Sequence, residues 1–355
     1  MLCQLVDANA PDTSVLKQAG EVIRRGGLVA FPTETVYGLG ADALNDEAVA
    51  RVYKAKGRPA DNPLIWHVNN VTELEKITRL SAETSSVVEQ LAKAFWPGPL
   101  TLVLNRKDEI NGIARKTGTN ETIAVRIPSH PVARALISAS GCIIAAPSAN
   151  VSGKPSPTQA AHVLEDFSAS NDIEMVLDGG ATQNGLESTV LDLHQEGKIT
   201  LLRPGAITLE MLKNVVGEVS VIAGGTESVE IEGAPLSPGM KYRHYAPKAP
   251  LFLITGYPET AIAQEICKRA KTSQKAGILA TTQTLHIYDN LPESNIFVLG
   301  NRKKPENMAQ DLFSCLRNFD ALGVEIIFVE GVDEDGIGTA IMNRLRKAAV
   351  EVIKV

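Results

Sequence analysis

The sequence predicts an α/β protein made of two domains. Its 355 residues are too many for one ordinary domain and suit two. Short apolar runs alternate with segments of helical periodicity, which is the pattern of strands and helices that share a sheet. The alternation stops in a stretch rich in glycine and proline at 217–249 and starts again at residue 250.

The first predicted domain covers residues 12–206 and is expected to hold a large mixed, twisted sheet. Residues 12–25 predict an amphipathic helix because Leu16, Ala19 and Ile23 lie on one face. Strands are predicted at 28–31, 64–68, 100–104, 123–127, 142–146, 175–177 and 188–193, and helices at 46–55, 84–95, 131–138 and 158–165. One more helix is predicted at 208–216, after the end of this domain.

Residues 217–249 predict an interdomain linker. Connections of this length without secondary structure are uncommon and usually have a function. The second domain, 250–355, predicts a smaller α/β domain with an open sheet. Its strands are expected at 251–254, 276–280, 296–299 and 325–330, and its helices at 259–271, 305–321 and 338–348.

Composition excludes several classes of protein. No apolar run reaches the ~18 residues of a membrane span, and Met1 to Pro11 lack the pattern of a signal peptide. The four cysteines are scattered without a CxxC pair, so neither a zinc site nor a disulfide framework is indicated, and a cytoplasmic location is expected. The net charge of −6 argues against a broad basic surface for stable nucleic-acid binding.

Polar residues follow the first buried strand, in the segment PTETVYGLG at 32–40. The side chains of Thr33, Glu34 and Thr35 need partners if they are buried. One interpretation is a turn with satisfied hydroxyls. The other is a wall of a ligand site, where Gly38 and Gly40 allow close approach of the backbone.

A cationic loop follows the predicted helix at 46–55. Lysines at the end of a helix can simply complement its dipole. That explanation does not cover Arg58, which lies beyond the helix. Lys56 and Arg58 in one short loop suit a polyphosphate, although no Walker A pattern occurs. His67, in the strand that follows, is compatible with either a structural or a functional role.

Further candidates lie at later strand ends. Arg126 interrupts an apolar run, so it needs either an ion-pair partner or an anionic ligand such as an amino-acid carboxylate. The hydroxyl and amide groups of APSAN, 146–150, could contact phosphate oxygens or serve ordinary turns. Arg203 could be a surface charge at a strand end. The linker segment SPGMKYRHYAP, 237–247, could either pack over a nucleotide or dock on a domain.

Together these segments resemble the YrdC/Sua5 family, specifically its longer Sua5 members, over most of residues 12–350. The order and spacing are specific, whereas each segment alone is not. The matching segments are PTETVYGLG at 32–40, KGRP at 56–59, NPLI at 62–65, AVRIP at 124–128, APSAN at 146–150, EST at 187–189, LRPG at 202–205, SPGMKYRHYAP at 237–247 and GIGTAIMNRLRKAA at 336–349.

The resemblance implies a YrdC-like domain with an α/β-twist fold, a linker and a Rossmann-like Sua5 domain. It implies a synthase that converts L-threonine, bicarbonate and ATP into threonylcarbamoyl-AMP and pyrophosphate, for the modification of adenosine 37 in tRNAs. Threonine would be held by Thr35, His67, Arg126, Ala146 and Ser188. ATP would be held by Arg58, Asn62, Thr122, Ser148, Ser156 and Arg203, with Lys56 and Asn150 beside the phosphates and His244 approaching the nucleotide.

A mechanism without a covalent protein intermediate follows from this hypothesis. Lys56 and Arg58 are the predicted catalytic residues, and Arg203 would help them to offset charge on the phosphates, with Mg²⁺ carried by the nucleotide. No protein metal site is predicted. The linker is expected to act as a lid over the labile adenylate. Downstream threonylcarbamoyl transferase proteins are the expected partners.

Two rival functions remain open at this point. One is carbamoyl transfer from carbamoyl phosphate, although related proteins of that kind carry extra acylphosphatase and zinc-finger parts that are not visible here. The other is a non-enzymatic RNA-binding protein, which the net negative charge disfavours.

Overall fold

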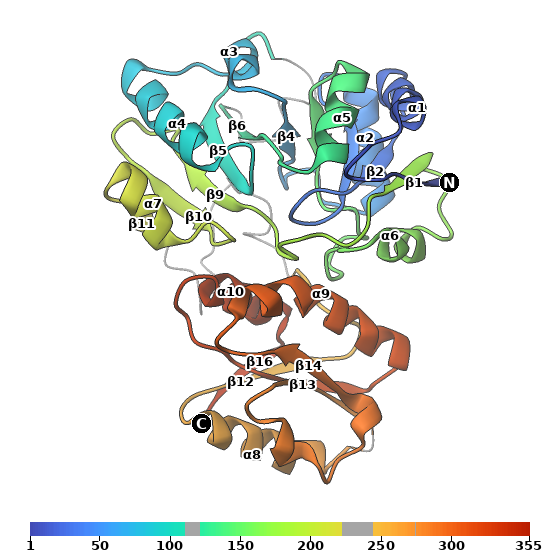
Figure 1. Ribbon diagram of the computed structural model, residues 1–355, viewed down its shortest axis with the longest axis vertical. Coiled ribbons are helices and arrows are strands. Elements are labelled where there is room, and N and C mark those ends of the chain that lie inside the picture. Colours follow the sequence, from blue (N-terminus) through green and yellow to red (C-terminus); the bar gives the residue numbers. More distant parts are fainter. Residues whose placement is uncertain (111–120, 222–243, 274) are drawn as a thin grey trace.

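Two β-sheets organise the chain in this computed structural model, which describes residues 1–110, 121–221, 244–273 and 275–355. Figure 1 shows the larger sheet and its helices stacked on the smaller sheet and its helices. The predicted α/β fold with a large mixed sheet and a second, smaller sheet is therefore confirmed. The predicted limits 12–206, 217–249 and 250–355 stay a prediction, and residues 237–243 of the linker segment lie outside the described residues.

In the described residues the larger sheet has eleven strands, in the order β1-β8-β2-β3-β7-β4-β6-β5-β9-β10-β11. Parallel and antiparallel pairs are mixed: β4 pairs with β6 in parallel and with β7 antiparallel. The strands are β1 (Leu2–Leu5), β2 (Val29–Phe31), β3 (Gly38–Asp42), β4 (Ile65–His67), β5 (Leu100–Asn105), β6 (Thr122–Arg126), β7 (Ile144–Ala146), β8 (Met175–Asp178), β9 (Thr189–Asp192), β10 (Thr200–Arg203) and β11 (Ser220–Val221).

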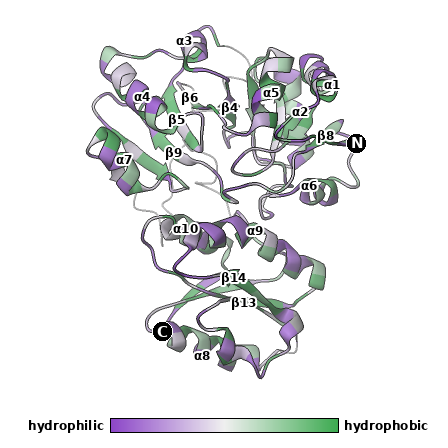
Figure 2. Ribbon diagram, viewed as in Figure 1, coloured by the Kyte–Doolittle hydropathy of each residue, from purple (hydrophilic) through white to green (hydrophobic). Residues whose placement is uncertain are grey.

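Helices around this sheet bury two apolar cores. Helices α1 and α5 pack against each other and contribute Leu16 and Leu136 to one core. The other core receives Val52 from α2 and Leu91 from α4. In Figure 2 the helices show hydrophobic and hydrophilic residues side by side, as amphipathic helices do. The helices are α1 (Thr13–Arg24), α2 (Asp46–Lys56), α3 (Leu74–Ile77), α4 (Ala82–Phe95), α5 (Pro131–Ser140), α6 (Ala160–Asp166) and α7 (Leu209–Val216).

The smaller sheet is parallel throughout its described pairs and has the order β14-β13-β15-β12-β16. Helix α8 lies on the face away from the larger sheet, whereas α9 and α10 lie between the two sheets (Figure 1). The elements are β12 (Leu251–Thr255), α8 (Glu259–Ala270), β13 (Ala276–Thr281), β14 (Ile296–Gly300), α9 (Pro305–Leu322), β15 (Ile326–Glu330), α10 (Gly338–Ala348) and β16 (Glu351–Lys354).

The two parts of the molecule share a buried interface formed by α9 and α10. Leu186 of the first part belongs to the same apolar cluster as Leu312 and Leu345 of the second. Arg317 of α9 forms an ion pair with Asp166 at 2.8 Å, and its guanidinium is almost fully buried. A second buried pair joins α10 to the functional pocket and is described below.

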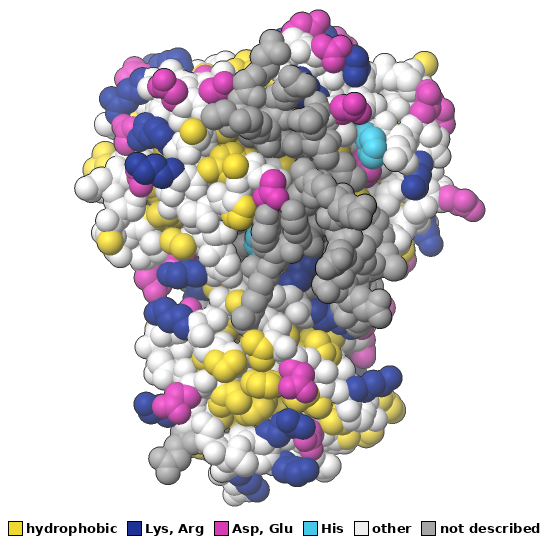
Figure 3. All heavy atoms as spheres, turned by 180° about the vertical axis from the view of Figure 1, so that it is seen from behind, with side chains coloured by type: hydrophobic (Ala, Val, Ile, Leu, Met, Phe, Trp, Pro, Cys, Tyr) yellow, Lys and Arg dark blue, Asp and Glu magenta, His cyan; other side chains and the backbone are white. Residues whose placement is uncertain are grey.

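The surface seen from behind carries charges of both signs. Lys and Arg side chains alternate with Asp and Glu side chains over the described part of this face, and hydrophobic side chains gather on the second domain (Figure 3). Among the described residues, every helix is too short or too polar to cross a lipid bilayer.

Candidate active site

A pocket opens in the larger sheet where several strands end. One side is the loop between β2 and β3, and the floor comes from the ends of β4, β6, β7 and β10. The residues before β9 and before β12 complete it. The lining residues are Thr33, Thr35, Val36, Tyr37, Gly38, Arg58, Ile65, His67, Arg126, Ala146, Pro147, Ser148, Glu187, Ser188, Arg203, His244 and Tyr245.

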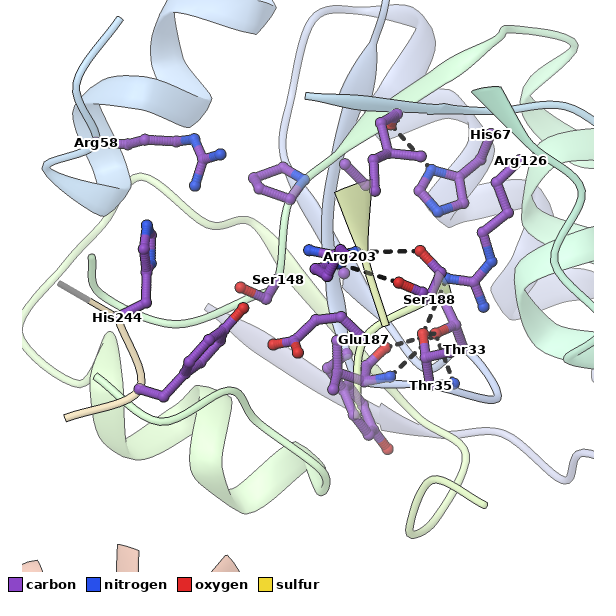
Figure 4. A pocket seen from close by; sticks show the side chains of 17 residues that line it. Thr33, Thr35, Arg58, His67, Arg126, Ser148, Glu187, Ser188, Arg203 and His244 are labelled. Carbon is purple, nitrogen blue, oxygen red and sulfur yellow. Dashed lines mark hydrogen bonds between the residues drawn. The ribbon is translucent and has the colours of Figure 1, made fainter. Parts of the chain in front are cut away.

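The pocket has two ends, as Figure 4 shows. Arg58 and His244 lie at one end, whereas Thr35, His67 and Arg126 lie at the other. Strand register explains the second group, because His67 of β4 pairs directly with Arg126 of β6. Ser148, Glu187 and Arg203 lie between the ends. Two small ligands could therefore bind side by side.

Arg126 is a buried cation with partners on three sides. Its Nη1 donates to Thr35 Oγ1 at 2.9 Å, and its Nε donates to the carbonyl oxygen of Gly98 at 3.3 Å. Its Nη2 lies 2.7 Å from Glu34 Oε1, and both side chains are almost fully buried. The structural ion pair considered from the sequence is thus present. Since Arg126 also lines the pocket, this pair fixes a guanidinium at the pocket wall.

Arg203 and Ser188 form the centre of the pocket. Arg203 Nε donates to the carbonyl oxygen of Ser188 at 3.0 Å, and its Nη2 donates to Ser188 Oγ at 3.1 Å. Thr101 Oγ1 lies 2.7 Å from the same hydroxyl. Burial lowers the pKa of Arg203 from its usual value. The arginine predicted as a candidate ATP ligand is therefore a rigid, buried group.

Arg58 reaches the pocket because α2 ends in a tight turn. Gly57 adopts a left-handed conformation with φ of 60°, and the backbone N–H of Arg58 bonds to the carbonyl oxygen of Tyr53. The Arg58 side chain donates to the carbonyl oxygens of Asn62 and Pro63 at 3.1 and 2.9 Å. Burial lowers the pKa of Arg58 to about 10, so the group is still cationic at neutral pH.

Lys56 does not line the pocket. Its Nζ donates to the carbonyl oxygens of Ser148, at 2.5 Å, and of Asn150. The ammonium group is buried, and burial, together with the nearby Arg58, lowers its pKa well below the usual value. Lys56 therefore holds the loop that carries Ser148, which does line the pocket.

Two histidines, the buried His67 and the partly buried His244, border the pocket in the neutral state. Burial, and then the charge of Arg126, lowers the pKa of His67 to about 3. Burial, and then Arg58, lowers the pKa of His244 to about 3. His67 Nδ1 lies 3.1 Å from the carbonyl oxygen of Ile65, whereas His244 Nε2 is buried without a hydrogen-bond partner among the described residues. A ligand could satisfy that nitrogen.

Among the residues that the structure describes, Glu187 is the one carboxylate in the lining of this pocket. Its Oε1 accepts a hydrogen bond from Ser156 Oγ, and its Oε2 accepts one from Arg344 Nε of α10 at 2.9 Å. Burial raises the pKa of Glu187, but Arg344 and Arg203 outweigh this effect, so its pKa lies below the usual value. The pocket thus contains an anion that is held from the second domain.

The structure brings most of the predicted site residues together. The predicted residues in the pocket lining are Thr35, Arg58, His67, Arg126, Ala146, Ser148, Ser188, Arg203 and His244. Those outside the lining are Lys56, Asn62, Thr122, Asn150 and Ser156. Thr122 begins β6, about 13 Å from Arg126 by the rise of a strand. Asn62 is buried with both amide atoms unpartnered among the described residues.

Comparisons with known proteins agree with this geometry. A family model for Sua5, YciO and YrdC, described as "Telomere recombination", matches residues 21–205, and the model "Threonylcarbamoyl-AMP synthase, C-terminal domain" matches residues 207–350. The threonylcarbamoyl-AMP synthase of Pyrococcus abyssi is 47% identical over 345 residues, which are 96% of each chain.

The chain belongs to the Sua5/YrdC family. The threonylcarbamoyl-AMP synthase of Bacillus subtilis is 45% identical over 94% of this chain and 92% of its own. The crystal structure of Pyrococcus abyssi Sua5 complexed with L-threonine superposes with a TM-score of 0.89 and 43% identity, and each chain is covered completely.

Sequence reasoning on this Sua5-type chain missed several lining residues. Glu187 was predicted only as part of the EST segment, Tyr245 only as one of the aromatic residues of the linker segment, and Thr33 only as part of a possible ligand wall without an assigned ligand. Tyr245 has a positive φ of 67° and stacks on Phe313 of α9 at 5.2 Å between ring centroids. Gly40 was expected to let a ligand approach the backbone closely. Core side chains pack against it instead, since an added Cβ would lie 2.8 Å from Phe31 and 2.9 Å from Ile144.

Proposed function

We propose that this chain condenses L-threonine, bicarbonate and ATP into threonylcarbamoyl-AMP and pyrophosphate. The observation that carries the proposal is one pocket whose two ends differ in chemistry (Figure 4). A cationic end suits a polyphosphate, and an end with a fixed guanidinium and hydroxyls suits an amino acid. The membership of the chain in a family with threonylcarbamoyl-AMP synthases supports the same reaction.

The threonine end would consist of Thr35, His67, Arg126, Ala146 and Ser188. Arg126 would bind the threonine carboxylate, because its position is fixed by Glu34 and Thr35 before any ligand arrives. Neutral His67 can accept a hydrogen bond on one ring nitrogen, while its other nitrogen can donate.

The nucleotide end would consist of Arg58, Ser148, Arg203 and His244, with Lys56, Asn62, Thr122, Asn150 and Ser156 acting from around the pocket. Lys56 would act by fixing the Ser148 loop through its two carbonyl bonds. Arg58 and Arg203 would offset the charge of the phosphates. Mg²⁺ would arrive on the phosphates of ATP, since it prefers substrate phosphates and water as ligands.

The chemistry would proceed in two steps. Bicarbonate loses hydroxide to give carbon dioxide, and the neutral amine of threonine attacks the carbon atom. The nitrogen then gives up a proton, which combines with the hydroxide as water, and a carbamate remains. A carbamate oxygen then attacks the α-phosphorus, while the bond to the leaving pyrophosphate breaks. Placing the reactants side by side in one buried pocket supplies much of the acceleration.

The product would serve the threonylcarbamoyl modification of adenosine 37 in tRNAs, with transferase proteins as downstream partners. Its anhydride bond is labile in water, so a transferase must consume it quickly. Four scattered cysteines favour a cytoplasmic site of action.

The test is to identify the product and to count pyrophosphate. The wild-type chain is incubated with ATP, threonine and bicarbonate, and the expected result is the mass of threonylcarbamoyl-AMP, with pyrophosphate release that requires all three substrates. Arg58→Ala should reduce this release at least about a hundredfold. Arg79→Ala is the matched control, because Arg79 pairs with Asp108 on the surface. Pyrophosphate release that does not depend on threonine would contradict the proposal.

A further inference from the structure

Arg344 belongs to the second domain but is bound by the first. It lies on α10 and has no exposed surface. Its Nε donates to Glu187 Oε2 at 2.9 Å, and its Nη2 donates to the carbonyl oxygen of Glu187 at 3.3 Å. Its Nη1 donates to the carbonyl oxygen of Pro204 at 2.7 Å. One guanidinium therefore binds both the segment before β9 and the segment after β10.

These two segments carry central groups of the pocket. Ser188 follows Glu187, and Arg203 precedes Pro204. The segments also approach each other closely, since a Cβ added to Gly205 would lie 2.5 Å from the backbone nitrogen of Thr189. A shift of either segment would change the contact between Arg203 and Ser188.

Glu187 passes the effect of Arg344 into the pocket. Its carboxylate lies between the two ends of the pocket and accepts a hydrogen bond from Ser156 (Figure 4). Without Arg344, the carboxylate would lack its ion-pair partner while the charge of Arg203 still acts on it. Glu187 would then neutralise a group that the proposed function assigns to ATP.

We infer that Arg344 is a positioning residue for the reaction: through Glu187 it aligns Ser188 and Arg203 and keeps the carboxylate away from Arg203. The pocket is complete only when α10 is docked. This inference rests on the proposed function. It gives the second domain a part in catalysis, although none of its helices or strands lines the pocket.

The alternative is that Arg344 merely holds the domains together. Arg317 provides the matched comparison, because it also is a buried arginine that crosses the same interface. It binds Asp166 through both Nη atoms, at 3.1 and 2.8 Å, and the carbonyl oxygen of Pro155 at 2.6 Å. None of these partners lines the pocket.

The experiment compares Arg344→Gln with Arg317→Gln in the full chain. We measure thermal unfolding, and kcat and KM for ATP and threonine from pyrophosphate release. Both variants should lower the unfolding temperature, but only Arg344→Gln should lower kcat/KM by roughly tenfold or more, against less than about threefold for Arg317→Gln. Arg344→Lys should recover part of the loss. Equal losses in the two glutamine variants would overturn the inference.

A double-mutant cycle tests the route through Glu187. Arg344→Gln should cost clearly less kcat/KM in the Glu187→Gln background than in the wild type, because the route through the Glu187 carboxylate is already lost there and only the bonds to the carbonyl oxygens of Glu187 and Pro204 remain to be removed. Independent, multiplied losses would contradict this route. Arg344→Gln alone leaves the Glu187 carboxylate buried without its cation and could fail to fold. The double variant removes both charges of the pair, so its activity can still be compared with that of Glu187→Gln. A wild-type chain that forms no product would refute the proposed function instead.

Discussion

At the scale of single residues, Arg126 offers the sharpest test of the threonine end. Its guanidinium is bound by Thr35, Gly98 and Glu34, so a lysine could not keep all three contacts. We expect Arg126→Lys to raise KM for threonine at least about tenfold, with a smaller change in KM for ATP. Steady-state kinetics of pyrophosphate release measures both constants.

The control for this change is another buried arginine. Arg106 donates to the carbonyl oxygens of Lys107 and Ile110 and lies outside the pocket lining. Arg106→Lys should leave both KM values within about twofold of the wild type, because the hydrogen bonds that it removes join carbonyl oxygens outside the pocket lining. A similar rise in both KM values for Arg126→Lys would show that Arg126 is not specific to threonine.

Residue types alone predicted only part of the candidate site. The basic loop predicted a phosphate site, and Arg58 does line the pocket. Lys56, two residues earlier, instead faces the carbonyl oxygens of the Ser148 loop. Sequence spacing gives the position of a side chain on its element, but the partner of Lys56 is 92 residues away and depends on tertiary packing.

At the scale of elements, the approach of β10 to β9 can be tested at Gly205. An added Cβ would lie 2.5 Å from the backbone nitrogen of Thr189 and 2.9 Å from the carbonyl oxygen of Glu187. Backbone atoms cannot move away from the new methyl group without strain. Gly205→Ala should therefore lower the free energy of unfolding by about 1–3 kcal/mol and impair pyrophosphate release. Urea denaturation and the release assay measure the two effects.

Gly141→Ala separates destabilisation from damage to the pocket. Gly141 ends α5 with φ of 65°, and nothing lies within 4 Å of an added Cβ. Alanine there costs about 1 kcal/mol through backbone strain alone. Activity should stay close to wild type at a temperature where both variants are folded. An equal loss of activity in both would show that Gly205 has no special link to the pocket.

Elements with clear periodicity were predictable, whereas others were not. The helix predicted at 12–25 is α1, Thr13–Arg24, because its apolar face repeats at helical spacing. Strand β3, Gly38–Asp42, was not predicted, since glycine is rare in strands and its segment reads as a loop. The edge strands β1 and β16 are short and largely exposed, so they lack the apolar run that marks a buried strand.

At the scale of the whole molecule, buried histidines predict how stability depends on pH. The pKa of His67 is lowered by burial to about 3, whereas an unfolded histidine has a pKa of about 6.5. As pH falls below 6.5, the imidazole of His67 binds a proton in the unfolded chain but not in the folded chain. Stability is therefore lost as pH falls, and His67 alone contributes about 2 kcal/mol of that loss at pH 5.

The test is to measure the free energy of unfolding in urea for the wild type and for His67→Gln at pH 8.5, 7.5 and 5. The difference between pH 7.5 and pH 5 should be smaller in the variant by about 2 kcal/mol, because glutamine does not titrate. Between pH 8.5 and 7.5 both proteins should change equally, since the histidine is neutral in both states. The same loss of stability in both proteins at pH 5 would mean that His67 is protonated in the folded protein, contrary to its burial between Phe31 and the Arg126 cation.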